Sequence, residues 1–268
     1  MKDKVVVITG ASEGIGKACA YQFAYGCKAV VIAARDASKL QDAENDLKKI
    51  NSNILSVVCD VSKEEDCKKL IDKAYDFFGR IDVLICNAGL SMRALFNDTD
   101  LSVIKNLMDV NFWGTVYATK YALPHLIKSH GSLVGISSIA GKKGLPGRSG
   151  YSASKFAMEG FLETIRTENL KNNLHVLVAC PGFTATAIRD KALGKDGTMQ
   201  GESPRNEKVM MTADEVAVAV FKAVANRKRD LILTTNGKLT VWLNKFFPAL
   251  MDKIVFNHMA KEDDSPFK

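Results

Sequence analysis

The sequence predicts an α/β fold, in which a single doubly wound parallel sheet of about seven strands carries helices on both faces. Short runs rich in Val, Ile and Leu recur along the 268 residues, as they do in buried parallel strands. Stretches with the helical spacing of apolar residues separate these runs. Composition agrees, because 47% hydrophobic and 25% charged positions are ordinary for a globular protein. Residues 1–268 are therefore expected to form one domain.

The expected elements alternate along the chain. Strands are expected over residues 5–9, 29–34, 54–59, 83–86, 132–136, 176–179 and 231–233. Helices are expected over residues 16–25, 38–50, 63–78, 101–127, 152–172 and 213–226. Two segments break the alternation. Residues 183–211 are rich in Gly, Thr, Met and charge, and so long a loop is usually functional, here a substrate lid. Residues 239–260 form an apolar tail.

Charge and cysteine content narrow the partners and the location. The formal net charge of +7 is spread without a run of five or more like charges, so nucleic acid is not an expected partner. The six cysteines include no C-x-x-C pair and lie mostly among apolar neighbours, as buried thiols of a reducing compartment do. No apolar run approaches the roughly 18 residues that cross a bilayer. The protein is expected to be cytoplasmic.

A glycine-rich turn follows the first expected strand. Glycines permit positive φ and close backbone approach, and the N-terminus of the next helix offers free N–H groups and a positive dipole end to a diphosphate. The alternative is a tight turn without a ligand. The turn reads Thr9, Gly10, Ala11, Ser12, Glu13, Gly14, Ile15 and Gly16, with the spacing G-x-x-x-G-x-G.

A candidate proton-transfer pair stands at the start of an expected helix. Tyr151 and Lys155 are four residues apart, so both side chains lie on one helix face. A nearby ammonium favours the ionised form of a phenol, which predicts that the pair shuttles a proton. Ser138 follows the expected strand 132–136, and such strand ends are where parallel sheets bind ligands. Taken singly, each of these residues could also serve packing or end a secondary structure element.

Together these motifs resemble the short-chain dehydrogenase/reductase family. The resemblance covers residues 4–233 and rests on the glycine spacing, on Asn87-Ala88-Gly89, on Tyr151 with Lys155, and on Pro181-Gly182. It implies a Rossmann-type dinucleotide-binding and catalytic domain that transfers a hydride between a nicotinamide and a carbonyl or secondary alcohol, with no metal. The segment 87–93 and the apolar tail resemble the subgroup that contains acyl-dihydroxyacetone-phosphate reductases and dehydrogenase/reductase member 7 proteins.

The resemblance also implies roles for single residues. Ser138 would hydrogen-bond the substrate carbonyl, Tyr151 would donate the proton, and Lys155 would also bind the nicotinamide ribose. Asn111 would hold a water that continues the proton relay. The residues implied to bind the cofactor are Gly10, Ser12, Glu13, Gly14, Ile15, Gly16, Arg35, Asp60, Val61, Asn87, Ala88, Gly89, Tyr151, Lys155, Pro181, Gly182, Thr184 and Thr186.

The end of the second strand favours NADP(H) over NAD(H). An acidic residue there would hold a ribose 2′-OH, whereas an arginine suits a 2′-phosphate. This chain has Ala34 at the acidic position and Arg35 next to it. Two residues argue against NADP(H). Asp36 could turn toward the ribose, and Glu13 stands where many NADP enzymes have a second basic residue. We expect Asp36 to cap the following helix instead.

Substrate and partners are less closely defined. An apolar pocket mouth is expected from Leu90, Met92, Leu95, Phe183 and Ile188, which favours an apolar or lipid-like carbonyl substrate. Three alternatives stay open: an NAD-dependent alcohol dehydrogenase of the same family, a catalytically silent cofactor-sensing protein, and an epimerase or dehydratase, which usually carries a larger substrate domain. The resemblance implies a homodimer or homotetramer built on helices 101–127 and 152–172. The tail is expected to pack on its own pocket or a partner subunit, with peripheral membrane contact as the alternative.

Overall fold

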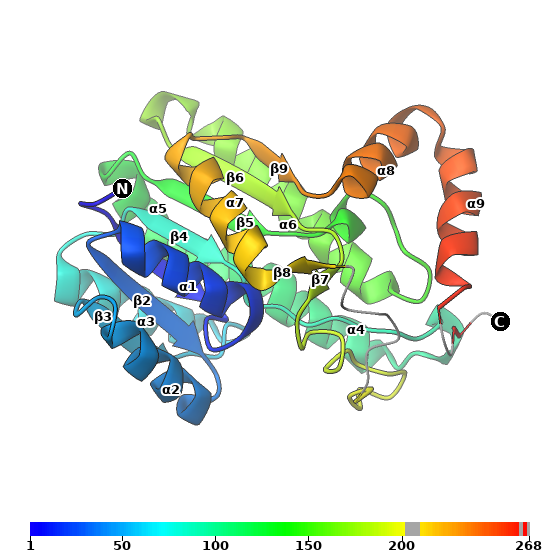
Figure 1. The fold of residues 1–268 in the computed structure, drawn as a ribbon, viewed down its shortest axis with the longest axis horizontal. Coiled ribbons are helices and arrows are strands. Elements are labelled where there is room, and N and C mark those ends of the chain that lie inside the picture. The colour runs from blue at the N-terminus through cyan, green and yellow to red at the C-terminus, as the bar shows by residue number, and fades with distance from the viewer. Residues whose placement is uncertain (202–209, 263–264, 267–268) are drawn as a thin grey trace.

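The computed structural model describes residues 1–201, 210–262 and 265–266, and its centre is a parallel sheet (Figure 1). Within these residues the sheet has seven strands in the order β3-β2-β1-β4-β5-β6-β9, each parallel to its neighbours. The predicted α/β fold is confirmed. The strands are β1 Val5–Thr9, β2 Ala29–Ala34, β3 Ile54–Val58, β4 Val83–Cys86, β5 Ser132–Ile136, β6 His175–Cys180 and β9 Asp230–Ile232.

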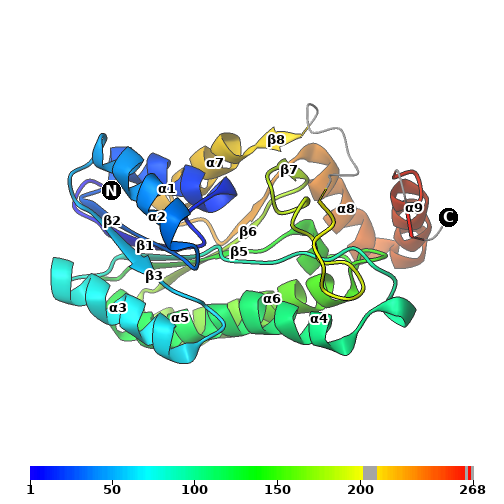
Figure 2. The ribbon, with the colours of Figure 1, turned by 90° about the horizontal axis from the view of Figure 1, so that it is seen from below.

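Helices cover both faces of the sheet, as Figure 2 shows: α1, α2 and α7 lie on one face, and α3, α4, α5 and α6 lie on the other. Two further helices, α8 and α9, stand at one end. The helices are α1 Gly14–Gly26, α2 Ala37–Lys48, α3 Glu64–Phe78, α4 Leu101–Leu107, α5 Gly114–Lys128, α6 Ser149–Glu168, α7 Ala213–Ala225, α8 Thr235–Phe246 and α9 Pro248–Met259.

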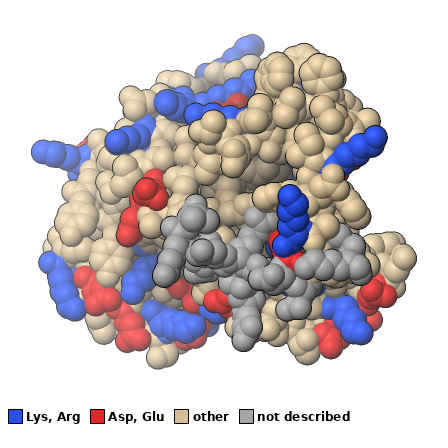
Figure 3. Space-filling model, turned by 45° about the vertical axis from the view of Figure 1, so that its right-hand side comes forward, with Lys and Arg blue, Asp and Glu red and all other residues tan. Residues whose placement is uncertain are grey.

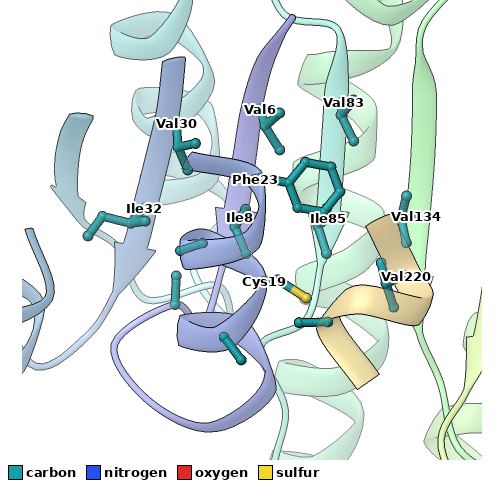
Figure 4. Close-up of a cluster of buried hydrophobic side chains, with 14 of the residues drawn as sticks. Val6, Ile8, Cys19, Phe23, Val30, Ile32, Val83, Ile85, Val134 and Val220 are labelled. Carbon is teal, nitrogen blue, oxygen red and sulfur yellow. The ribbon is translucent and has the colours of Figure 1, made fainter. Parts of the chain in front are cut away.

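The alternation of side chains along the strands produces two cores. In β1, Val6 and Ile8 pack toward α1 and α7, whereas Val7 packs on the opposite face. Figure 4 shows the first core, where Phe23 of α1 lies against the strands. Every residue of β1 and β2 is buried, which explains why their sequences are apolar throughout rather than alternating.

Near the site, two helices of the structure differ from those expected from the sequence. The expected helix 101–127 contains a π-helical segment, Met108–Trp113, between α4 and α5. The extra residue in this turn places the buried side chain of Asn111 against the loop after β4. Helix α6 begins at Ser149, earlier than predicted, so Tyr151 lies in its first turn. A 3-10 turn, Leu170–Asn172, follows its end.

The two irregular segments have more structure than the sequence suggests. Within the predicted lid, β7 Thr184–Ala185 pairs with β8 Met211–Thr212, although residues 202–209 lie outside the described part. The tail forms α8 and α9, and α9 buries Met251, Val255 and Met259 against Leu145 and Leu243. Part of the tail therefore packs on its own chain, as predicted. Among the described residues, no helix combines the length and apolarity that crossing a membrane requires.

Candidate active site

A cleft of about 940 Å³ opens where the parallel strands end. Its wall includes residues that directly follow five neighbouring strands of the sheet: Gly10 after β1, Arg35 after β2, Asn87 after β4, Ser137 after β5 and Pro181 after β6. Parallel strands expose their carboxyl ends at one sheet edge, so residues distant in sequence converge there.

The glycine-rich turn forms one wall of this cleft. Gly10 and Gly14 have φ of 65° and 55°, the left-handed region that favours glycine. A Cβ on Gly10 would lie 2.7 Å from the Cα of Ala88, so the backbone of the neighbouring loop leaves no space for a side chain. Helix α1 begins at Gly14, in the lining of the cleft, and Glu13 does not cap it with its side chain, so the first N–H groups, which have no acceptor within the helix, are available to a ligand.

The triplet after β4 holds this turn in place. The Asn87 side chain donates to the backbone oxygens of Thr9 and Gly10, both at 3.0 Å. The Thr9 hydroxyl in turn accepts from the backbone N–H groups of Asn87 and Ala88, both at 3.1 Å. Asn87 therefore supports the shape of the glycine turn, which explains why the two motifs occur together.

The predicted catalytic side chains meet at the middle of the cleft. Ser138, Tyr151 and Lys155 all line it. Lys155 is only 3% exposed and donates to the backbone oxygen of Ile136 at 2.9 Å. Its Nζ lies 5.9 Å from the centre of the Tyr151 ring. The structure thus brings the three residues together as the sequence predicts.

The electrostatics of the pair differ from the prediction. Burial raises the pKa of Tyr151, and its hydrogen-bond interaction with Ser138 and the charge of Arg148 only partly oppose that effect. Burial also lowers the pKa of Lys155 to about 8. Burial of Tyr151 therefore outweighs any lowering of its pKa of the kind that the spacing from Lys155 predicts. At neutral pH Tyr151 is a neutral phenol that can donate a proton.

The far end of the cleft is rich in charge. Arg35 and Lys39 line it, and the Asp36 carboxylate accepts from the backbone N–H of Lys39 at 3.1 Å as the cap of α2. The expected capping role of Asp36 is confirmed. Glu13 forms ion pairs with Lys39, at 3.5 Å, and with Lys191. Burial acts to raise the pKa of Glu13, but these two lysines outweigh it and the net pKa is lowered.

Most other residues predicted to bind the cofactor also line the cleft: Ser12, Ile15, Val61, Ala88, Gly89, Gly182, Thr184 and Thr186. Three predicted residues lie behind its wall instead. Gly16 packs against Gly10 and Asn87, with no room for a Cβ. The Asp60 carboxylate accepts from the N–H and hydroxyl of Ser62.

Asn111 is the third residue behind the wall. Its side chain accepts from the backbone N–H of Leu90 at 2.7 Å and donates to the Leu90 oxygen and to Ser154. These bonds occupy both ends of its amide, so the side chain holds the loop after Gly89. The Asn111 side chain therefore positions the wall rather than facing the substrate space.

The pocket mouth is predicted only in part. Leu90, Phe183 and Ile188 line the cleft, but Met92 is fully buried in a separate apolar cluster and Leu95 is not among the lining residues. The lining residues that sequence reasoning missed include Lys39, Leu145, Arg148 and Lys191. Lys39 stands one helical turn after Arg35, a spacing that could have indicated it. The other three reach the cleft through tertiary contacts that carry no local signal.

Comparisons with known proteins agree with this site. The family described as short chain dehydrogenase matches residues 4–196. A dehydrogenase/reductase SDR family protein 7-like of Dictyostelium discoideum is 35% identical, over 94% of this chain and 80% of its own length. The 11-beta-hydroxysteroid dehydrogenase 1A of Arabidopsis thaliana is 33% identical, over 93% of this chain and 73% of its own length.

Solved structures resemble it as well. An alcohol dehydrogenase from Thermococcus sibiricus, complexed with 5-hydroxy-NADP, has a TM-score of 0.77 and 26% identity, and the match covers 87% of this chain and 96% of that one. A short-chain dehydrogenase/reductase from Burkholderia phymatum, in complex with NAD, has a TM-score of 0.81 with 24% identity, over 93% of this chain and 95% of that one. The second likeness concerns the fold alone.

Fold and site together define an NAD(P)-dependent oxidoreductase. The chain belongs to the short-chain dehydrogenase/reductase family, and within it to the dehydrogenase/reductase member 7 subgroup.

Proposed function

We propose that this enzyme uses NADPH to reduce the carbonyl group of an apolar or lipid-like substrate to a secondary alcohol. The observation that carries the proposal is the site itself: a neutral, partly buried phenol at Tyr151 beside Ser138 and Lys155, in a cleft lined by both cationic and apolar side chains. A neutral phenol suits reduction, because reduction consumes a proton at the substrate oxygen.

The cleft fits a nicotinamide dinucleotide. The positive-φ residues Gly10 and Gly14 carry no side chain, so a ligand can approach the backbone of the loop 10–14 closely at these two positions. The N-terminus of α1 that follows suits a diphosphate. Thr186 lies beside this loop, since a Cβ on Gly14 would be 3.5 Å from its methyl carbon. We propose that Val61 and Gly89 flank the adenosine and nicotinamide parts, and that Lys155 binds the nicotinamide ribose.

The preference for NADP(H) is proposed from the charges after β2. Arg35, just before the cap of α2, is exposed at the cleft, and Lys39 lies in the first turn of α2, so two cations line the end of the cleft proposed for a 2′-phosphate. Asp36 is engaged through its Oδ1 as the cap of α2. The negative charge of Glu13 opposes a phosphate, but Lys39 and Lys191 pair with it and reduce that effect.

The chemistry follows from where the donors lie. When bound, a reduced nicotinamide supplies a hydride to the carbonyl carbon. The Ser138 hydroxyl donates a hydrogen bond to the carbonyl oxygen and the Tyr151 hydroxyl transfers its proton there. Proton transfer leaves Tyr151 as a phenolate, and the positive charge of Lys155, held by the Ile136 oxygen, would stabilise that phenolate.

An apolar substrate is proposed from the other end of the cleft. Leu90, Leu145, Phe183, Ile188 and Met199 line it there. Phe183 is also covered on one side by the Arg189 guanidinium, 5.9 Å from its ring centre, which restricts the aromatic surface open to a substrate. The relative named 11-beta-hydroxysteroid dehydrogenase supports a fused-ring or similarly apolar carbonyl compound.

The test measures NADPH and NADH oxidation with aldehydes, aliphatic ketones and ketosteroids, together with both cofactor dissociation constants. In Arg35→Ala, the loss of a charge-assisted contact should weaken NADPH binding about ten- to a hundredfold and leave NADH binding unchanged. Arg229→Ala, an exposed arginine remote from the cleft, is the control. An unchanged NADPH to NADH ratio in Arg35→Ala would reject the cofactor proposal in favour of an NAD-dependent enzyme. Binding without turnover of any carbonyl would favour a cofactor-sensing protein.

Partners and location are proposals as well. The exposed rings of Trp113 and Phe156, at the α5 and α6 face, support a homodimer or homotetramer through these helices. The six free thiols are all buried, which suits the cytoplasm. Light scattering after size exclusion tests the oligomer: a monomer at micromolar concentration would reject it.

A peripheral lipid contact is proposed for the tail helices. In α8, Leu239, Trp242 and Phe246 form an exposed stripe, and Lys238 and Lys245 lie along one edge of it. Figure 3 turns the right-hand side of Figure 1 forward and shows a broad surface of residues other than Lys, Arg, Asp and Glu above a hollow. Flotation with anionic vesicles should carry the intact protein and fail after deletion beyond Asn236. Equal flotation of both would reject the proposal.

A further inference from the structure

A buried carboxylate lies behind the catalytic residues, and the reaction as described leaves it without a role. Glu159 is 8% exposed and follows Lys155 by one turn of α6. Its Oε1 accepts from the Ser137 hydroxyl at 2.6 Å and lies 3.4 Å from the Cys180 thiol. Its Oε2 pairs with Lys142 at 2.6 Å. Burying a charge is costly, so such a paired carboxylate needs an explanation.

Three residues of one α6 face interact with three consecutive residues at the end of β5. Tyr151 interacts with Ser138, Lys155 bonds the Ile136 oxygen, and Glu159 bonds the Ser137 hydroxyl. The spacing of four residues along the helix places these side chains in one row. Each of these three side chains of α6 therefore interacts with a different residue of the segment 136–138.

The opposite side of this segment is fixed by its backbone. The N–H of Ser137 donates to the Ala179 oxygen at 2.7 Å, and the N–H of Ile139 donates to the Pro181 oxygen at 3.2 Å. A Cβ on Gly141 would collide with both the Glu159 carboxylate and the Ser137 hydroxyl. The space around the carboxylate is therefore tightly packed. Ser138 lies between Ser137 and Ile139, whose backbone N–H groups are both hydrogen-bonded.

The charge of Glu159 also acts on the buried ammonium group of Lys155. The titratable groups around Lys155 are Cys180 from β6, Cys86 from β4, and Tyr151 and Glu159 from its own helix. Burial raises the pKa of both thiols, that of Cys86 to about 12, so both are neutral near pH 8. Tyr151 is neutral there too. Among these neighbours Glu159 is the one that carries a charge.

The surroundings of Glu159 complete the electrostatic picture. Lys142, from the turn after Ser138, pairs with it and stays part-exposed, and Asp230 of β9 acts on both Lys142 and Cys180. Lys142 offsets part of the field of Glu159 at Lys155, but its side chain is 29% exposed, and solvent screens its charge more than that of the buried carboxylate. The effect on Lys155 therefore keeps the sign of the carboxylate, as the contribution of Glu159 to Lys155 shows.

We propose that Glu159 is a positioning residue of the active site: it anchors Ser138 through Ser137 and favours the ammonium form of the buried Lys155. The proposal needs only the oxidoreductase activity of the family and holds for either cofactor and any carbonyl substrate.

The test compares Glu159→Gln with Glu163→Gln. The first keeps the size and hydrogen-bonding oxygen of the side chain and removes its charge. The second removes a charge one turn further along α6, from a carboxylate whose side chain is 65% exposed and paired with Arg229. NMR of [ε-13C]lysine-labelled, ligand-free enzyme follows the titration of Lys155, assigned by its loss in Lys155→Met. This readout needs no substrate or cofactor, so its outcome is separate from that of the proposed function.

Glu159→Gln should lower the titration midpoint of Lys155 by about half a pH unit or more, and the alkaline limb of kcat should move with it. Glu163→Gln should leave both unchanged. Glu159→Asp keeps the charge and serves as the second variant: the midpoint should stay near that of wild type, while kcat falls because the shorter side chain no longer reaches Ser137. A loss of activity in Glu159→Gln without a shifted midpoint, an equal shift in Glu163→Gln, or wild-type kcat in Glu159→Asp would each overturn the proposal.

Discussion

Replacing Gly10 by alanine should disturb the wall of the cleft that is proposed to bind the cofactor. The residue has φ of 65°, where a Cβ costs about 1–2 kcal/mol. The added Cβ would also lie 2.7 Å from the Cα and 3.0 Å from the N of Ala88, and these backbone atoms must shift. Forcing extra volume into a packed site typically costs about 1–3 kcal/mol. The free energy of unfolding should therefore fall by about 2–5 kcal/mol.

The same shift should weaken cofactor binding at least about tenfold, because Asn87 and Ala88 move away from the glycine turn they support. The control is Gly160→Ala, in the interior of α6, where the new Cβ would have no described neighbour within 4 Å beyond the adjoining residues and the backbone of its own helix. That variant should gain about 0.5–1 kcal/mol, since alanine is the better helix former. Urea denaturation and a fluorescence titration with NADPH measure both quantities. Wild-type stability and affinity in Gly10→Ala would refute the account of this wall.

Two further predictions concern the lid and the pH dependence of binding. Hydrogen exchange of the described lid residues 183–201 should slow on NADPH binding, as expected of a segment that closes over the cleft, and equal protection with and without NADPH would count against a lid. The Lys155 pKa of about 8 means that its ammonium is present below that pH and is lost as the pH rises through it. NADPH affinity should therefore decline above about pH 8 in wild type but not in Lys155→Met, and parallel pH profiles for the two would contradict the ribose contact.

Much of the fold could be predicted because its signals are local. The fully apolar runs of β1 and β2 mark buried parallel strands, and the glycine spacing marks the turn that follows β1. Ser138, Tyr151 and Lys155 could be found because their order and spacing can be read directly from the sequence. The π-helical segment within residues 101–127 could not be predicted, because it goes with hydrogen bonds of Asn111 to a loop distant in sequence.

The electrostatics of the site also lay beyond the sequence. The spacing of Tyr151 and Lys155 suggested that the ammonium would act on the phenol, but the degree of burial depends on all the elements packed around them, and it raises the pKa of Tyr151. The ion pair of Glu13 with Lys191 spans residues far apart in the chain and could be seen only in three dimensions. Charges and burial that depend on tertiary contacts leave no local pattern.

The central claim is that Tyr151 delivers the proton to a carbonyl oxygen in a site already able to bind the cofactor. Its most direct test is the kcat of Tyr151→Phe for NADPH-dependent carbonyl reduction, with the NADPH dissociation constant measured alongside. The variant removes only the hydroxyl that interacts with Ser138, so kcat should fall about a hundredfold or more while cofactor affinity stays within a few fold. A variant that keeps more than about a tenth of the wild-type kcat would contradict the account.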